Sequence, residues 1–170
     1  TPSTACLVQG AVGAVNAFAF DISAACSGFV YALSIADKFI KSGSYKKALV
    51  IGAETLSKIV DWKDRATCVL FGDGAGGAIL EATDKGGILA EDLHAMGEDG
   101  LKLTGGERLP NNMVYTSERA DNPYLTMDGR AIFNFATKVV PNSINTIIEK
   151  SGVSIDDVKY IVPHQANSRI

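Results

Sequence analysis

The stretch DISAACSGF, residues 21–29, places Cys26 among small residues, between an apolar run and a long helical pattern. If residues 17–22 form a strand that leads into a helix over 27–42, Cys26 lies at the N-terminal end of that helix. Unpaired backbone N–H groups and the helix dipole favour a thiolate there. The arrangement resembles a nucleophile elbow with Cys in place of Ser. A thiol packed in the core is the alternative, because cysteine is often buried.

His164 is the second candidate, at the end of the apolar run VKYIVPH, residues 158–164. Functional groups gather at the carboxyl ends of strands in α/β sheets. A thiol and an imidazole at two such ends could therefore act as a nucleophile and its partner. A structural histidine is the alternative reading of His164, and it is the one we favour for His94.

Two further stretches carry cationic side chains. In DWKDRAT, Trp62 and Arg65 could together hold an anionic or planar group, or each could be ordinary solvated surface. Arg169 follows His164 closely and could meet an acidic partner near a site entrance.

The sequence GDGAGG, residues 72–77, matches the spacing of a dinucleotide-binding loop. Such a loop must lead into a helix that holds the pyrophosphate, whereas the following AILEAT is strand-like. We therefore predict a tight glycine turn between two antiparallel strands.

The other segments predict a mixed α/β order with a sheet buried on both faces. In chain order we expect a short helix in 1–16, a strand at 17–22, a helix over 27–42, a buried strand at 46–54, sheet through 67–97, a long loop at 98–125, a helix over 127–150 that Pro141 kinks, a capped turn at 154–157 and a strand at 158–164.

Composition excludes several function classes. The 170 residues are 46% hydrophobic with a net charge of −3, which argues against a general nucleic-acid binder. No apolar run is as long as a membrane span, and no signal-like segment opens the chain. Cys6, Cys26 and Cys68 lack metal-ligand spacing, so we expect no metal site, reduced thiols and a cytoplasmic location, with Cys6 and Cys68 in the core.

Five stretches together carry a family resemblance: DISAACSGF, DRAT, LFGDGAGGAIL, LTMDGRAIFNFA and VPHQANSRI. Their order and spacing resemble β-ketoacyl-[acyl carrier protein] synthase III, the initiating condensing enzyme of bacterial type II fatty acid synthesis. The resemblance covers essentially the whole chain and implies an internal fragment. Its fold would be α/β, the thiolase-like layered αβαβα fold, of which this chain is roughly the middle half. Residues 1–84 would end the N-terminal half, and residues 85–170 would begin the C-terminal half.

The resemblance also assigns roles to individual residues. Cys26 would be the acyl-accepting nucleophile and His164 a catalytic partner, while the family's catalytic Asn would lie beyond Ile170. Arg65 would stack on the CoA adenine, and Arg169 would help dock the carrier protein. The pantetheine tunnel would be lined by Leu70, Phe71, Gly129, Phe133, Ala166 and Asn167.

The implied activity is an acyltransferase reaction, the decarboxylative Claisen condensation of an acyl-CoA primer with malonyl-[acyl carrier protein]. It needs no metal or redox cofactor, and the implied assembly is a homodimer without nucleic-acid or membrane partners. A related thiolase-fold condensing enzyme of polyketide type and a Cys–His acyl-thioester hydrolase are the alternative enzymes. A non-catalytic interaction domain is the alternative from another class.

Overall fold

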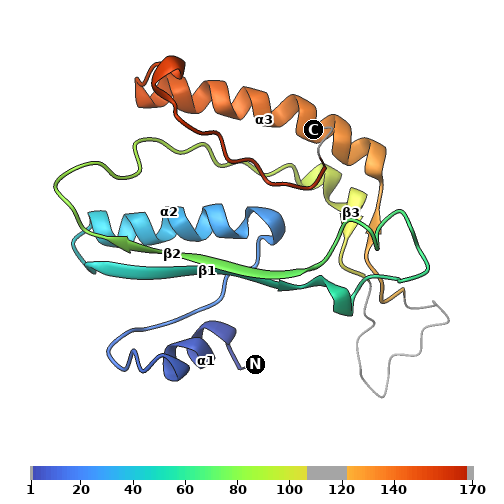
Figure 1. Ribbon diagram of the computed structural model, residues 1–170, viewed down its shortest axis with the longest axis horizontal. Helices are drawn as coiled ribbons and strands as arrows, with labels where there is room; N and C mark the ends of the chain where they lie inside the picture. The colour runs from blue at the N-terminus through green and yellow to red at the C-terminus, as the bar shows by residue number, and fades with distance from the viewer. Residues whose placement is uncertain (1, 107–121, 168–170) are drawn as a thin grey trace. The chain divides into compact units, whose positions relative to one another are not determined.

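The computed structural model describes residues 2–106 and 122–167 of the chain (Figure 1). It divides into two compact units: residues 1–52 with 77–82, and residues 53–76 with 83–170. The expected division into two thiolase-like halves at residue 84 stays a prediction. Among the described residues, no helix combines the length and apolar character needed to cross a bilayer.

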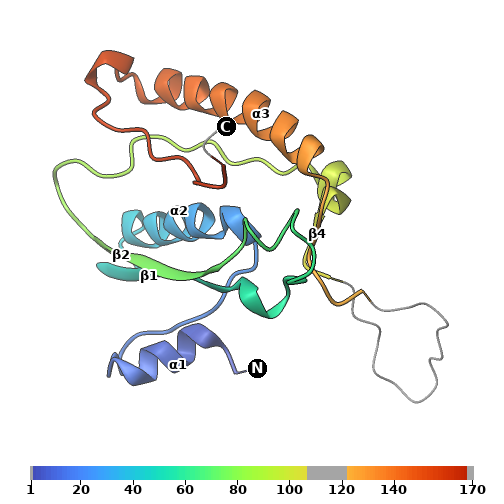
Figure 2. The ribbon, with the colours of Figure 1, turned by 45° about the vertical axis from the view of Figure 1, so that its right-hand side comes forward.

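In the first unit, two helices cover opposite faces of a pair of strands. Helix α1 (Thr4–Ala11) lies on one face of β1 (Lys47–Thr55) and β2 (Asp73–Glu81), and α2 (Gly28–Lys41) lies on the other, as two views agree (Figure 1, Figure 2). Both helices confirm the sequence patterns that predicted them.

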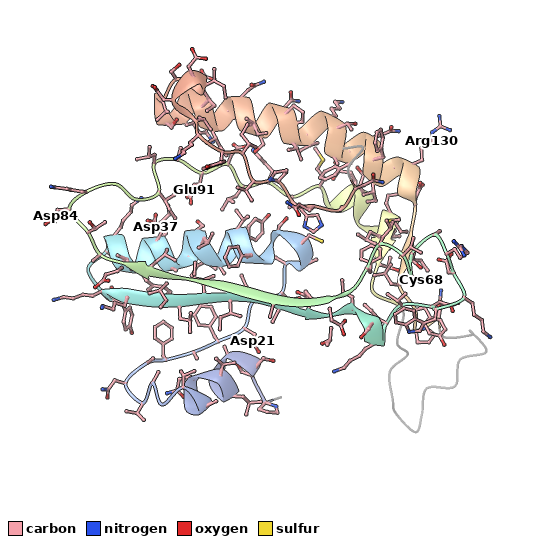
Figure 3. The ribbon with its side chains drawn as sticks, viewed as in Figure 1. Asp21, Asp37, Cys68, Asp84, Glu91 and Arg130 are labelled. Atoms are coloured by element: carbon pink, nitrogen blue, oxygen red, sulfur yellow. The ribbon has the colours of Figure 1, made fainter. Side chains whose placement is uncertain are left out.

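Polar groups fix the ends of these two helices. The Ser3 side chain caps α1 by accepting the N–H of Cys6 at 3.3 Å. The Asp21 carboxylate accepts the N–H groups of Ala5 and Thr4, both at 2.8 Å, and these two bonds lower the pKa of Asp21 (Figure 3). Helix α2 stops at Gly43, whose φ of 77° is a backbone state that glycine adopts without strain.

The strands β1 and β2 pair with each other in a two-stranded sheet. The Ala82 N–H donates to the Lys46 oxygen at 2.8 Å, and Lys47 and Glu81 form an ion pair at 2.8 Å. Because the end of β2 thus lies beside the start of β1, the two strands run antiparallel.

The predicted glycine turn is wrong, because Gly74, Gly76 and Gly77 all lie inside β2. A Cβ atom on Gly77 would stand 2.8 Å from the Val50 oxygen, so the close approach of the β1 backbone requires a glycine there. The preceding apolar residues 67–70 are not a strand either but form hydrogen-bonded turns.

Three more predicted sheet segments are absent from the part of the chain that the structure describes: 17–22, 86–97 and 158–164. A strand exists through ladder bonds to a neighbouring backbone, and an apolar pattern does not by itself supply that neighbour. A sheet buried on both faces is likewise not observed. Val50 is buried, but the adjacent Leu49 and Ile51 are exposed, as is Val162 in the last segment.

The second unit is built around α3 (Gly129–Ser151), which confirms the long predicted helix. The Asp128 carboxylate caps α3 by accepting the Ala131 N–H at 3.0 Å, and Gly152, with φ of 68°, ends the helix. The helix continues through Pro141.

Short elements complete the second unit. Strands β3 (Leu103–Thr104) and β4 (Thr126–Met127) form an antiparallel pair, with β3 inside the predicted long loop at 98–125 and β4 just after it. The 3-10 turns are η2 (Leu56–Lys58), η3 (Gly97–Lys102) and η4 (Ile155–Asp157). The predicted cap at residue 154 is confirmed, since the Ser154 side chain accepts the Asp156 N–H at 3.3 Å.

Candidate active site

Cys26 lies in a sharp turn at the start of α2. It is the middle residue of the 3-10 turn η1 (Ala25–Ser27), and α2 follows directly. Ala25 has a φ of 47°, a strained value for a residue other than glycine. Cys26 itself is exposed, so the alternative of a thiol packed in the core does not describe it. This backbone arrangement presents a thiol at a helix N-terminus, where a substrate carbonyl can reach it.

The first turn of α2 is held against β1 by an aromatic ring. A Cβ atom on Gly52 would stand 3.4 Å from Cδ2 of Phe29, so the glycine leaves the space that the Phe29 ring occupies. Phe29 lies in the first turn of α2, three residues after Cys26 in η1, so this contact packs the start of α2 against β1 close to the thiol.

His164 belongs to the second unit and lies in a segment outside regular secondary structure. It is exposed, as are Ala166 and Asn167 beyond it. The imidazole therefore follows a segment that, within the described residues, is not part of a sheet, so the strand predicted at 158–164 is not found. Arg169 lies outside the described residues.

Arg65 and Trp62 are both exposed on a turn that two aspartates organise. Asp61 Oδ1 accepts the Lys63 N–H at 2.9 Å, and Asp64 Oδ1 accepts the Ala66 N–H at 3.0 Å. Asp64 Oδ2 accepts the Thr67 hydroxyl at 2.7 Å.

The Thr67 hydroxyl and then the Ala66 N–H lower the pKa of Asp64, because both hydrogen bonds favour the carboxylate.

Four of the expected tunnel residues occupy two places in the second unit. The Leu70 and Phe71 N–H groups both donate to the Thr67 oxygen, at 3.0 and 3.3 Å, so these residues continue the same turn. Leu70 is exposed and Phe71 half-buried. Gly129 and Phe133 lie one helical turn apart at the start of α3 and therefore share a face of it.

The sequence predicted Cys6 and Cys68 in the core, and the structure buries only Cys68, and that in part. Cys6 is exposed, and its thiol donates to the Ala19 oxygen at 3.3 Å, so its placement in the core is wrong. A short helix with no buried residue gives it no core to enter. Cys68 is half-buried (Figure 3).

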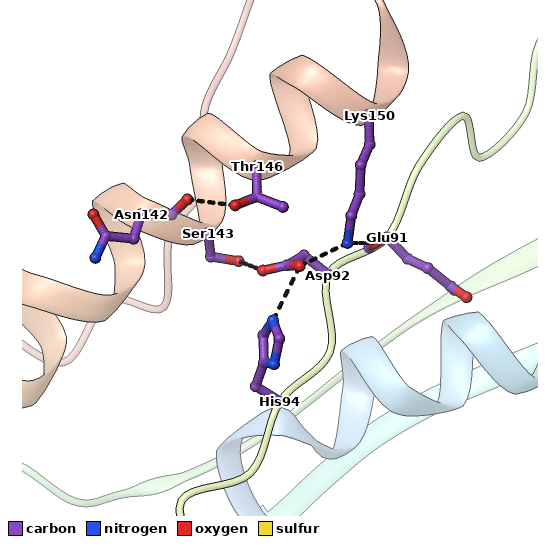
Figure 4. A network of polar contacts seen from close by, with 7 residues as sticks. All are labelled: Glu91, Asp92, His94, Asn142, Ser143, Thr146 and Lys150. Carbon is purple, nitrogen blue, oxygen red and sulfur yellow. Dashed lines mark hydrogen bonds and ion pairs between the residues drawn. The ribbon is translucent and has the colours of Figure 1, made fainter.

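A polar network around Asp92 was not predicted (Figure 4). The Asp92 carboxylate accepts the Ser143 hydroxyl at 2.8 Å and the Lys150 ammonium at 2.9 Å, both from α3, and lies 3.1 Å from Nε2 of His94. The side chain of Asp92 is only 4% exposed. Lys150 first, then Ser143 and more weakly His94 lower the pKa of Asp92 to about 2.

The network gives His94 a structural partner, as the sequence predicted. The spacing of Ser143 and Lys150 places both on one face of α3, which was the available sequence signal. Their partner Asp92 is far away in the sequence, so the pairing itself could not be found there.

Known proteins match this chain over nearly all of its length. Residues 20–97 match the family described as 3-oxoacyl-[acyl-carrier-protein (ACP)] synthase III. The chain is 56% identical over 169 residues to a β-ketoacyl-[acyl-carrier-protein] synthase III of Streptococcus equi subsp. equi (strain 4047), with 99% of this chain and 52% of that protein covered. The corresponding Streptococcus mutans serotype c protein is 55% identical with the same coverage.

Solved structures agree with these matches. The 3-oxoacyl-[acyl-carrier-protein] synthase III of Aquifex aeolicus VF5 aligns with a TM-score of 0.85 and 46% identity, over 99% of this chain and 51% of that one. The priming β-ketosynthase of the R1128 polyketide pathway aligns with a TM-score of 0.86 and 35% identity, over 99% and 50%. The chain thus spans about half the length of the curated relatives it matches.

Proposed function

We propose that this chain is part of a member of the β-ketoacyl-[acyl carrier protein] synthase III family, with the thiolase-like fold of that family, and that the full-length protein is an initiating condensing enzyme. It would join an acyl-CoA primer to malonyl-[acyl carrier protein] in fatty acid synthesis. The observation that carries the proposal is the exposed Cys26, placed at the N-terminus of α2 by the strained Ala25.

Cys26 performs the first step. Its thiolate attacks the thioester carbonyl of the acyl-CoA, a new C–S bond forms, and CoA leaves as the thiolate. Backbone N–H groups at the start of a helix stabilise the negative oxygen of the tetrahedral intermediate. The exposed position of the thiol supports this step, because a primer must reach it from solvent.

His164 acts in the second step. Loss of CO2 from the malonyl thioester leaves an enolate, whose negative oxygen His164 stabilises together with the family's Asn. The enolate carbon then attacks the acyl carbonyl on Cys26, a C–C bond forms, and the Cys26 thiolate is released. A thioester already activates its carbonyl, so the proposed reaction uses no metal or redox cofactor.

The assembly and the location are further parts of the proposal. We expect a homodimer that works in the cytoplasm, where thiols stay reduced. The proposed partners are acyl-CoA and an acyl carrier protein. Leu70, Phe71, Gly129, Phe133, Ala166 and Asn167 are proposed to line the pantetheine path, with Arg65 at the CoA adenine and Arg169 at the carrier protein.

Mass spectrometry of the full-length protein after incubation with a panel of acyl-CoAs tests the nucleophile. We expect one acyl group on Cys26 in the wild type and none at this position in Cys26→Ala. Cys6→Ser is the matched control, because Cys6 is also an exposed thiol of the first unit, and it should acylate normally. Unchanged acylation of Cys26→Ala would overturn the proposal.

Two alternative activities use the same thiol. An acyl-thioester hydrolase would release free acid without malonyl-[acyl carrier protein], whereas a condensing enzyme forms a β-ketoacyl product only with it. A polyketide-type synthase would share the chemistry, and the alignment with the R1128 priming enzyme keeps it as the second candidate. Product analysis with and without the malonyl donor separates hydrolysis from condensation.

A further inference from the structure

The strained turn that carries Cys26 has to be held at both of its ends. Ala25, directly before the thiol, has a φ of 47°. A residue other than glycine keeps such a conformation only where the surrounding structure fixes the chain around it. The contacts that anchor the chain before and after the turn therefore decide where the thiol stands.

After the turn, the chain is anchored through α2. The Phe29 ring occupies the space that Gly52 leaves on β1. This contact belongs to the first turn of α2, so it holds the chain just after the thiol.

Before the turn, the chain is anchored by Asp21. The two oxygens of its carboxylate accept one N–H group each, from Thr4 and Ala5, both at 2.8 Å (Figure 3). These N–H groups open α1, and the first N–H groups of a helix have no partner within it. Asp21 is 17 residues away from Thr4 along the chain, so the bonds join α1 to the segment that enters the turn.

Capping α1 does not by itself account for the two bonds to Asp21. The Ser3 side chain directly before the helix already caps it by accepting the Cys6 N–H. The segment before the turn also contacts α2 through Phe18, whose ring centroid lies 5.6 Å from that of Phe39. Asp21 follows Phe18 and is closer to the turn, so it holds the chain at the point where the turn begins.

We propose that Asp21 is a positioning residue for the nucleophile, because its bonds to α1 keep the Cys26 thiol aligned with the N–H groups at the start of α2. The inference rests on the proposed function, which makes Cys26 the acyl acceptor. Attack on a thioester requires that the sulfur and the N–H groups that stabilise the oxyanion face the same carbonyl. Alkylation by a small reagent such as iodoacetamide forms no oxyanion and requires only the exposed thiol.

Single-turnover acylation of the full-length protein by acetyl-CoA, followed by mass spectrometry, tests the role of Asp21. For Asp21→Ala we expect the rate constant at saturating acetyl-CoA to fall roughly 10- to 100-fold, since a displacement of about 1 Å has an effect of this order. The concentration of acetyl-CoA that gives half of the maximal rate should change little. Asp21→Asn keeps one oxygen as an acceptor and should recover part of the rate.

Two controls separate positioning from a general loss of structure. Iodoacetamide should alkylate Cys26 in Asp21→Ala as fast as in the wild type. Gln9→Ala is the matched variant, because it removes another side-chain hydrogen bond of α1, from Nε2 of Gln9 to the Ala14 oxygen at 2.6 Å. It should acylate normally. If Asp21→Ala does not fold, Asp21→Asn carries the same comparison, with acylation slower than in the wild type and alkylation unchanged.

Normal acylation of the Asp21 variants would overturn the inference, and so would an equal loss of acylation and alkylation or an equal loss of acylation in Gln9→Ala. If acetyl-CoA does not acylate Cys26 in the wild type, the proposed function fails instead. Hydrogen–deuterium exchange then decides the role of Asp21. The amides of residues 22–28 should exchange faster in Asp21→Ala than in the wild type and in Gln9→Ala, and equal exchange in all three contradicts the inference.

Discussion

The surroundings of Cys26 and of His164 are built in different ways. Around Cys26 the backbone does the positioning: Ala25 takes a φ of 47°, η1 turns the chain, and α2 begins at once. His164 lies in an extended segment without ladder bonds among the described residues, downstream of a single capped turn, η4.

The two regions depend on different interactions for their backbone conformation. A turn into a helix is specified by residues close together in the chain, through capping, φ preference and local hydrogen bonds. An extended segment needs a neighbouring backbone, which lies elsewhere in the chain. We therefore test the Cys26 region with glycine and alanine substitutions that change the backbone. We test the His164 region with substitutions that remove a side chain.

The largest effect is expected for His164→Ala. The condensation rate should fall roughly 10²–10³-fold, because a donor to the developing enolate oxygen is lost. Acylation of Cys26 should continue, and the free energy of unfolding should change by less than about 0.5 kcal/mol, since the side chain is exposed. Separate assays of acylation and condensation, with urea unfolding, check this. If His164→Ala lost acylation as well as condensation, the assignment of acylation to Cys26 and of enolate stabilisation to His164 would be wrong.

Gly77→Ala tests the close contact between the backbones of β1 and β2 in the first unit. The new Cβ would stand 2.8 Å from the Val50 oxygen, so β1 and β2 must separate, at a cost of about 1–3 kcal/mol of unfolding free energy. Gly76→Ala is the matched control, because a Cβ there meets no atom within 4 Å. Urea unfolding of the two variants should therefore differ clearly, and equal stabilities would contradict the tight strand contact.

Ala25→Gly tests the strained backbone beside Cys26, and here we expect the substitution not to reduce the stability of the protein. Glycine adopts a φ of 47° without strain, so we expect the free energy of unfolding to stay level or rise by up to about 1 kcal/mol. Ala24→Gly is the control, because Ala24 has a φ of −143° that alanine tolerates, and it should lose about 0.5–1 kcal/mol to chain entropy. Thermal or urea unfolding measures both. A larger loss for Ala25→Gly than for Ala24→Gly would exclude strain at the turn.

The smallest effect concerns pH and the side-chain network of the second unit. The folded state lowers the pKa of Asp92 from 3.8 to about 2, so it binds the proton less readily than the unfolded chain. The stabilisation by Asp92 is therefore complete above about pH 4 and is lost as the pH falls toward 2. The difference in unfolding free energy between wild type and Asp92→Asn should shrink over this interval. A difference that stays constant from pH 5 to pH 2 would show that the Asp92 charge is not involved.

Several features of this protein could be predicted from its sequence because they depend on neighbouring residues. The helices α1, α2 and α3, the cap at Ser154 and the place of Cys26 at a helix start all follow from periodicity, capping residues and glycine stops. The family resemblance also follows from sequence alone, because it rests on the order of short motifs.

Tertiary structure decided what depends on partners distant in the chain. Residues 73–77 of GDGAGG became part of β2 rather than a turn, because the β1 backbone lies against Gly77 and supplies its ladder partner. The extended segments at 17–22 and 158–164 have the composition of strands but no ladder among the described residues. The charge of Asp92 is held by Lys150 and Ser143, which only the packing of α3 brings near. A sequence records what each residue prefers, whereas a hydrogen-bond ladder or an ion pair also requires the position of the second partner.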